Sequence, residues 1–269
     1  ELYSMPMLSA WLDFAAHQTE VPACHLKFNT GMNRLGMEER ELSMVLNLIK
    51  ESRVKLSIAS VFSHLAASDD PAQDAFTKEQ IQRFSRISES LEKGLGIQVL
   101  KHISNSGAIQ RFPEAKFDMV RLGIALYGYG LGEDALALEP AVSLKSKVLQ
   151  VRTLNAGASV GYGRSYILPK DTEIAVVSIG YADGLPRRLG NTKGKLWIGG
   201  MACPIVGRVC MDLTMIDVGA LPFQVKPGMD VLVFGRVYGL ERFAHDCQTI
   251  PYEVISTIHQ RVPRLYIRD

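Results

Sequence analysis

Apolar and polar residues follow two different patterns along this chain. Up to about residue 130, short apolar segments are separated by longer amphipathic ones. Strands that are covered on both faces consist almost wholly of apolar residues, so the apolar segments predict buried strands. These predicted strands lie within residues 23–30, 55–65, 97–106 and 117–128.

The remaining segments of this first half have the periodicity of helices. Residues 1–20, 37–52 and 77–96 repeat apolar side chains at the spacing of one helix face, and Thr77 is the predicted N-cap of the third helix. Strands that alternate with helices indicate a parallel sheet covered by helices. In β/α barrels the carboxyl ends of such strands carry the chemistry, so polar residues there are candidates for a site.

After about residue 138 the chain changes to strands joined by turns rich in Gly, Pro and Asp. This pattern predicts a compact, mainly antiparallel β domain, closed by a helix over 251–262 with Pro251 at its start. We therefore divide the chain into a β/α part, 1–137, and a C-terminal β domain, 138–269. The predicted strands of the β domain lie within 141–154, 172–181, 195–207, 211–219 and 229–235.

Composition narrows the possible functions. The chain has 269 residues, of which 47% are hydrophobic and 22% charged, and its formal net charge is only +2. Such a balance, without a long basic run, argues against nucleic-acid binding, and no apolar stretch is long enough to cross a bilayer. The cysteines lack metal-ligand spacing, so we predict free buried thiols, no metal site and a reducing, cytoplasmic location.

Four polar residues at the ends of predicted barrel strands could bind an anionic ligand. Arg34 follows a glycine turn, where a guanidinium could clamp a carboxylate, and Ser106 lies at the mouth of a short helix that suits phosphate. Arg121 and His64 each end an apolar strand. Each residue taken alone could be a surface or structural group. Their common position at the strand ends favours an anion-binding site.

Three segments of the β domain carry further candidates. Tyr162 lies between two glycines, and Met211 follows an apolar strand. In the segment 178–191, Tyr181 and two arginines surround an Asp183-Gly184 turn. A packed turn would explain each of these segments, and a role in a site is the alternative.

Seven segments together resemble the alanine racemase family of fold-type III pyridoxal-phosphate enzymes, and they occur in the order of that family. The resemblance implies an incomplete TIM-type (β/α)8 barrel that binds pyridoxal 5'-phosphate, followed by the β domain. It also implies a bacterial isomerase that interconverts L- and D-alanine to supply D-alanine for peptidoglycan. The segments are HLKFNTGMNRLGM, SHLAASDD, SNSGAIQRFPEAKFDMVRLGIALYG, VGYGRSY, IGYADGLPRRL, GRVCMDLTMIDVG and YEVISTIHQRVPRLY.

The resemblance also implies which residues hold the cofactor. Arg121 would face the pyridine nitrogen, and its permanent charge would keep that nitrogen unprotonated and weaken the ring as an electron sink. His64 would form a hydrogen bond with Arg121. The other cofactor-binding residues implied in this way are Asn105, Ser106, Gly123, Ile124 and Tyr252.

By the same resemblance the substrate site is shared by two chains of a homodimer. Tyr162, from the partner subunit's copy of the chain, would be the base that acts on L-alanine. Arg34 and the backbone of Met211 would bind the carboxylate of this small amino acid.

The resemblance to the family also implies roles for residues around the substrate site. Tyr181, Asp183 and Arg187 would line the corridor by which the substrate enters. Lys27 corresponds to a lysine that is carbamylated in some members of the family. Asn29 stands where the family usually has an aspartate, so the local charge differs.

The Schiff-base lysine of the family lies in a KANAYGHG-like motif that does not occur in this sequence. We therefore expect the first barrel strands and that lysine to be missing, and the chain to be inactive alone. Two alternatives remain. One is a racemase of serine or of several amino acids, and the other is a non-catalytic pyridoxal-phosphate homeostasis protein on the same barrel, which lacks the β domain.

Overall fold

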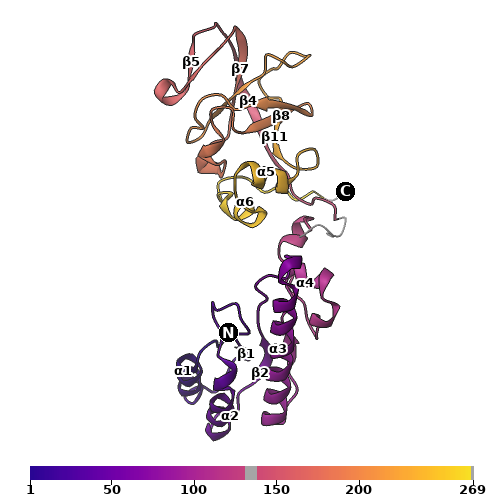
Figure 1. The fold of residues 1–269 in the computed structure, drawn as a ribbon. Coiled ribbons are helices and arrows are strands. Elements are labelled where there is room, and N and C mark those ends of the chain that lie inside the picture. The colour runs from indigo at the N-terminus through magenta and orange to yellow at the C-terminus, as the bar shows by residue number, and fades with distance from the viewer. Residues whose placement is uncertain (131–137, 268–269) are drawn as a thin grey trace. The chain divides into compact units, whose positions relative to one another are not determined.

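The computed structural model describes residues 1–130 and 138–267. The chain divides into two compact units, coloured indigo to magenta and magenta to yellow along the chain in Figure 1. One consists of Glu1–Leu126 and Gly130–Leu138, and the other of Tyr127–Tyr129 and Glu139–Asp269. The first unit is parallel α/β, and the second is mainly antiparallel β.

The first unit is built on a parallel sheet in which the strand order is β1-β2-β3. The register sets His25 beside Ser60 and Phe62 beside His102. The alternation of strands and helices predicted for this half is therefore confirmed. The strands are β1 (Cys24–Lys27), β2 (Ile58–Phe62) and β3 (Leu100–His102), and the helices are α1 (Met5–Ala15), α2 (Leu42–Glu51), α3 (Asp74–Leu95) and α4 (Ser106–Arg111).

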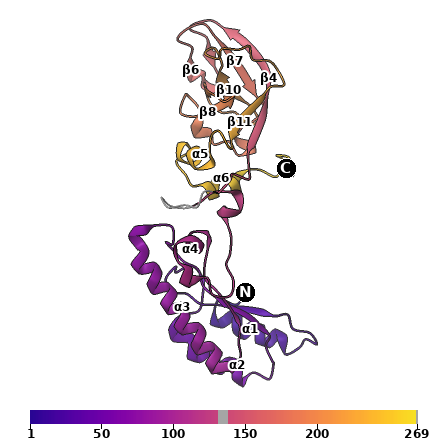
Figure 2. The same cartoon turned by 90° about the vertical axis from the view of Figure 1, so that its right-hand side faces the viewer.

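The helices bury their apolar faces against this sheet. Leu8 and Leu12 of α1, Val45 of α2 and Phe84 of α3 join the strand residue Leu26 in one core. In Figures 1 and 2, α2 and α3 lie side by side. Burial of large apolar side chains is the main stabilising contribution in such a unit. The helices thereby hold the carboxyl ends of the strands in place.

Two details of the first unit differ from the sequence predictions. Thr77 is a buried residue inside α3 and is not its N-cap, because Pro71 and the Asp70 carboxylate, which accepts from the Ala72 N–H at 2.9 Å, start the helical segment earlier. The described segment 117–128 contains no strand. It follows β3 through isolated backbone hydrogen bonds, from Asp118 to Lys101 and from Arg121 to Ser104, and then turns into a 3-10 helix.

The second unit contains the antiparallel sheet predicted from its alternating pattern. Its larger sheet has the strand order β10-β7-β4-β11-β8-β9, and β5 pairs with β6 in a separate hairpin. The strands are β4 (Leu144–Leu154), β5 (Ser159–Val160), β6 (Tyr166–Ile167), β7 (Thr172–Val177), β8 (Lys195–Ile198), β9 (Met201–Pro204), β10 (Thr214–Asp217) and β11 (Asp230–Phe234).

The second unit also differs from the predictions in two places. The segment 195–207 forms a hairpin, β8 and β9, because Gly199 and Gly200 both adopt the left-handed conformation that tight hairpins need. The closing helical region comprises two short helices, α5 (Leu240–Asp246) and α6 (Pro251–Thr257), of which only the second was predicted. Within this unit, α5 and α6 lie at one end and the β5–β6 hairpin at the other (Figures 1 and 2).

The cysteines were predicted to be free and buried, and the burial is wrong for Cys210, which is only partly buried because it lies in a turn. All four cysteines are free, and burial raises the pKa of the Cys203 thiol to about 11 and that of Cys247 to about 12. In residues 1–130 and 138–267, no helix is both long and apolar enough to cross a membrane. The same residues hold no cluster of His, Cys, Asp or Glu side chains arranged for a metal ion.

Candidate functional site

The guanidinium of Arg121 is the centre of a polar site at the carboxyl ends of β2 and β3. One terminal nitrogen donates a hydrogen bond to Nδ1 of His102. The other donates to the carbonyl oxygens of Ser63, at 2.7 Å, and Ile103, at 3.2 Å, and to Nδ1 of His64 at 3.2 Å. Backbone carbonyls and imidazoles thus fix the orientation of the cation. The sequence predicted Arg121 and His64 for this site but missed His102.

Aromatic packing supports the same group. The ring of Phe62 stacks on His102 with the ring centres 4.8 Å apart and the planes 11° apart. The Arg121 guanidinium lies 5.5 Å from the centre of the Phe62 ring, and the Lys27 ammonium lies 5.2 Å from it. Both cations are therefore within the range of cation–π attraction to one ring.

Both histidines beside Arg121 are neutral at physiological pH. Burial, followed by the positive charges of Arg121, Arg34 and Lys27, lowers the pKa of His64 to about 4. Burial and then Arg121 lower the pKa of His102 to about 4 as well. Burial also lowers the pKa of the Arg121 guanidinium, which still remains charged. The site therefore holds one cation between two neutral imidazoles.

The hydrogen bonds of His102 define its tautomer. A guanidinium only donates, so Nδ1 of His102 is the acceptor and Nε2 carries the proton. That N–H faces Oγ of Ser60 at 3.1 Å, and the Ser60 hydroxyl faces Nδ1 of His25 at 2.6 Å. The chain of bonds from Arg121 to His25 thus crosses all three strands. His102 could have been found from the sequence, because it lies near the end of the predicted strand 97–106. That strand was expected to run parallel to the strand 55–65, which carries His64.

These histidine pKa values predict a pH dependence of stability. A histidine whose folded pKa is near 4 and whose unfolded pKa is near 6.5 costs stability as the pH falls from 6.5 towards 4, because the unfolded chain binds the proton more readily. In the full-length protein, urea unfolding at pH 7, 5.5 and 4.5 should show this loss, and His102→Asn should reduce it. His245→Asn is the matched control, since that side chain is 91% exposed. An equal pH slope in all three proteins would contradict the prediction.

Ser106, the first residue of α4, contacts the backbone of the segment that follows Arg121. Its Oγ accepts hydrogen bonds from the backbone N–H groups of Gly123, at 2.9 Å, and Ala125, at 3.5 Å. The hydroxyl proton of Ser106 has no acceptor among the described residues, so it can be donated to a ligand. Asn105 acts as the N-cap of α4 and accepts from Ala108 at 3.2 Å, and Ile124 is buried beneath this turn.

Lys27 and Arg34 differ in their surroundings. The Lys27 ammonium donates to the Glu1 carboxylate at 2.6 Å, whereas Arg34 is exposed. The Asn29 amide group donates to Asn33 at 2.8 Å and to Glu38 at 2.9 Å. A neutral amide therefore orients the turn that carries Arg34, where an aspartate was expected from the family. Carbamylation of Lys27 stays a prediction.

In the second unit, Tyr162 occupies a turn built by its neighbouring glycines. Gly161 and Gly163 have φ of 74° and 69°, a region that favours glycine. A Cβ on Gly163 would lie 3.2 Å from Nη1 of Arg208, so that guanidinium packs against the turn. The Tyr162 side chain is 70% exposed. It is thus held by a fixed backbone while its hydroxyl group remains accessible.

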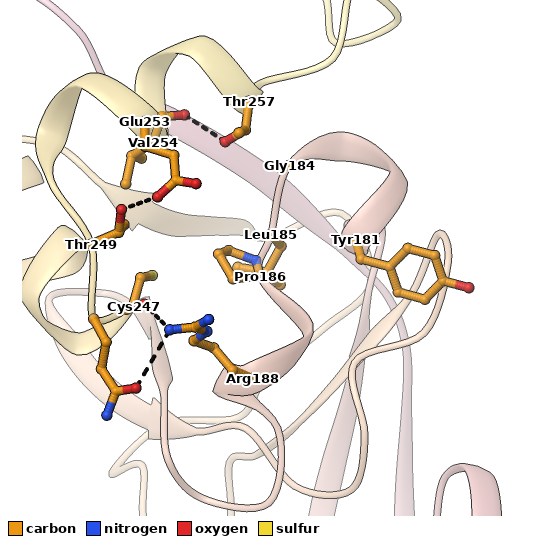
Figure 3. A pocket seen from close by; sticks show the side chains of 11 residues that line it. Tyr181, Gly184, Leu185, Pro186, Arg188, Cys247, Thr249, Glu253, Val254 and Thr257 are labelled. Atoms are coloured by element: carbon orange, nitrogen blue, oxygen red, sulfur yellow. Dashed lines mark hydrogen bonds between the residues drawn. The ribbon is translucent and has the colours of Figure 1, made fainter.

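Of the three predicted corridor residues, Tyr181 lines a cavity of about 290 Å³ in the second unit, whereas Asp183 and Arg187 are not among the residues that line it. Tyr181 contributes to its edge, but its ring points away from the cavity (Figure 3). Arg188 donates to the Cys247 carbonyl at 3.1 Å across the cavity, while Arg187 is exposed. Asp183 follows Tyr181 in the same 3-10 turn and accepts from the Gly180 N–H at 2.9 Å.

Met211 and Tyr252 are also exposed in the second unit. The backbone N–H of Met211 has no acceptor in the described part of the chain, and its carbonyl accepts from Ala182 at 3.0 Å. Tyr252 lies on α6, at the opposite end of this unit from the hairpin of Tyr162 (Figures 1 and 2). Two predicted members of one site therefore lie far apart within the unit.

The parallel α/β unit with a polar site at its strand ends, followed by an antiparallel β unit, defines a two-domain protein of the β/α-barrel class. Residues 1–130 match the family model "Alanine racemase, N-terminal domain", and residues 141–266 match "Alanine racemase, C-terminal domain". The chain belongs to the alanine racemase family, whose cofactor is pyridoxal 5'-phosphate.

Individual relatives agree with this assignment. The alanine racemase of Desulfosudis oleivorans is 40% identical over 90% of this chain and 65% of its own length, and alanine racemase 1 of Oceanobacillus iheyensis is 36% identical over 99% and 72%. The crystal structure of the Bartonella henselae enzyme with covalently bound pyridoxal phosphate superposes with a TM-score of 0.87 at 32% identity, over 99% of this chain and 72% of its own. This chain thus spans about two thirds of the length of such relatives.

The residues of the first unit fit the cofactor of this family. The Nε–H of Arg121 has no acceptor among the described residues, and an aromatic ring nitrogen is an acceptor of the right kind. The free hydroxyl proton of Ser106 suits a phosphate oxygen. Arg121 and Ser106 would therefore hold the two ends of the group, with Phe62 and the neutral histidines around Arg121.

Proposed function

We propose that the protein to which this chain belongs interconverts L- and D-alanine with pyridoxal 5'-phosphate. The observation that carries the proposal is the Arg121 site, with an unused Nε–H and neutral histidine partners, in a chain that matches both domains of the family. The test is the appearance of D-alanine from L-alanine, and the reverse reaction, with the full-length protein and added cofactor. Parallel assays with L- and D-serine address the broader-specificity alternative.

The residues of this chain have distinct tasks in the proposed reaction. Pyridoxal phosphate, when bound, withdraws electrons from an amino acid and so acidifies its α-hydrogen. The fixed charge of Arg121 limits that withdrawal and disfavours side reactions. Arg34 and the Met211 N–H bind the substrate carboxylate and orient the α-carbon. Tyr162, as the phenolate, takes the α-proton of L-alanine, and in the reverse reaction the resulting phenol returns a proton to the same face.

We propose further that each site combines residues of two chains. Support comes from the positions of Tyr162 and Tyr252, which lie at opposite ends of one unit and so suit two different sites. A homodimer with exchanged residues lets Tyr162 serve the site of its partner and Tyr252 the site of its own chain. We also propose that Tyr181, Asp183 and Arg187 line the corridor by which the substrate enters. The proposal further includes a domain boundary at residue 137 and a cytoplasmic location.

A complementation experiment tests the shared site. Tyr162→Phe protein is mixed with a full-length variant that lacks the cofactor-binding lysine, under conditions that exchange subunits. Each variant alone should be nearly inactive, and the mixture should recover activity because one site of each heterodimer then has both bases. Heterodimers that form, as shown by native mass spectrometry, but remain inactive would contradict a site made from two chains.

A further inference from the structure

Arg261, in the segment after α6, connects two turns that carry predicted substrate residues. Its Nε donates to Oδ1 of Asp183 at 2.7 Å, and one terminal nitrogen donates to Oδ1 of Asp212 at 2.6 Å. Asp183 belongs to the turn of Tyr181, and Asp212 follows Met211 directly. One guanidinium therefore joins two carboxylates that are distant in the sequence.

The backbones of the two turns are also joined directly. The N–H of Tyr181 donates to the Cys210 carbonyl at 3.0 Å, and the N–H of Ala182 donates to the Met211 carbonyl at 3.0 Å. A Cβ on Gly180 would lie 2.2 Å from the Met211 carbonyl oxygen, so only glycine permits this approach. The two turns consequently form one body, and a displacement of Asp212 would move the Met211 amide.

Arg261 also balances the charge of this body. In the described part of the chain, the ion pairs of Asp183 and Asp212 are both formed with Arg261. Without the guanidinium the two carboxylates would repel each other, and the turns would lose the two side-chain hydrogen bonds through which Arg261 joins them. Two carboxylates beside the Met211 N–H would also repel an approaching carboxylate ligand.

We propose that Arg261 is a positioning residue that holds the Met211 amide and the Tyr181 turn in place for the substrate carboxylate. This inference rests on the proposed function, because it assigns a task to residues of that substrate site. In this role Arg261 does not itself transfer a proton. Its loss should therefore weaken substrate binding more than it slows the chemical step.

The experiment compares variants of the full-length protein. Arg261→Gln should raise KM for L-alanine roughly tenfold and leave kcat within about threefold, and Arg261→Lys should recover part of the loss. Asp212→Asn added to Arg261→Gln should recover part of the increase in KM, because it removes one of the two carboxylates that are left unpaired and repel the substrate carboxylate. Arg264→Gln is the matched control: that arginine lies in the same segment but donates to the carbonyls of Ile258, His259 and Val262.

A second measurement separates this inference from the proposed function. Hydrogen exchange of the segments 178–184 and 208–213 should become faster in Arg261→Gln and stay unchanged in Arg264→Gln. If the unaltered protein does not racemise alanine, the proposed function fails. The hydrogen-exchange result would still test whether Arg261 joins the turns of Tyr181 and Met211. Unchanged KM or unchanged exchange in Arg261→Gln, or equal effects of both variants, would overturn the positioning role.

Discussion

Replacement of Tyr162 by phenylalanine is expected to lower alanine racemisation roughly 10²- to 10⁴-fold, the usual contribution of a positioned acid or base. Racemisation removes a proton from one face of the α-carbon and returns one to the other face, so two groups must act from opposite sides. In the proposed reaction Tyr162 supplies one of them, and its glycine turn, packed against Arg208, holds the phenol in place. Loss of the hydroxyl group should therefore stop proton transfer at one face of the α-carbon and leave proton transfer at the other face.

Solvent exchange in deuterated water measures the two faces separately. Tyr162→Phe should abolish α-deuterium incorporation into L-alanine while some incorporation into D-alanine persists. Tyr166→Phe, which removes a hydroxyl from the adjacent strand β6, is the matched control and should keep both exchange reactions. Equal losses for the two enantiomers in Tyr162→Phe would show that Tyr162 is only structural.

Replacement of Arg121 by glutamate is the second change with a large expected effect. It removes the cation and leaves the acceptors on His64, His102, Ser63 and Ile103 without their donor. A carboxyl group at this position would favour protonation of the cofactor's ring nitrogen and strengthen electron withdrawal. We expect a fall in racemisation of roughly 10²-fold or more, together with transamination as a new side reaction.

The cofactor spectrum provides a measurement that does not depend on turnover. The visible absorption of the bound cofactor should change in Arg121→Glu when alanine is added, and pyruvate should accumulate. Arg121→Lys keeps the positive charge with fewer donors, so it should lose activity without a comparable increase in transamination. An unaltered spectrum and unaltered product ratio in Arg121→Glu would exclude Arg121 as the partner of the ring nitrogen.

Local patterns in the sequence predicted most elements of the fold. The amphipathic spacing of Leu8 and Leu12 placed the first helix, and apolar segments placed β1, β2 and β7. Boundaries failed where a side chain outside the pattern decided them, as Asp70 did by capping the 3-10 turn that leads into α3. The strand predicted over 117–128 failed because apolar composition alone does not say whether a backbone finds a partner to pair with.

The sequence alone determined the order of the elements, the glycine turn of Tyr162 and the polar residues at the strand ends, because these depend on neighbours along the chain. Only the tertiary structure revealed that His102, Ser60 and His25 connect Arg121 across three strands, and that Arg261 joins Asp183 to Asp212. Such contacts depend on strand register and on distances between segments far apart in sequence. A periodic pattern of apolar residues carries no information about them.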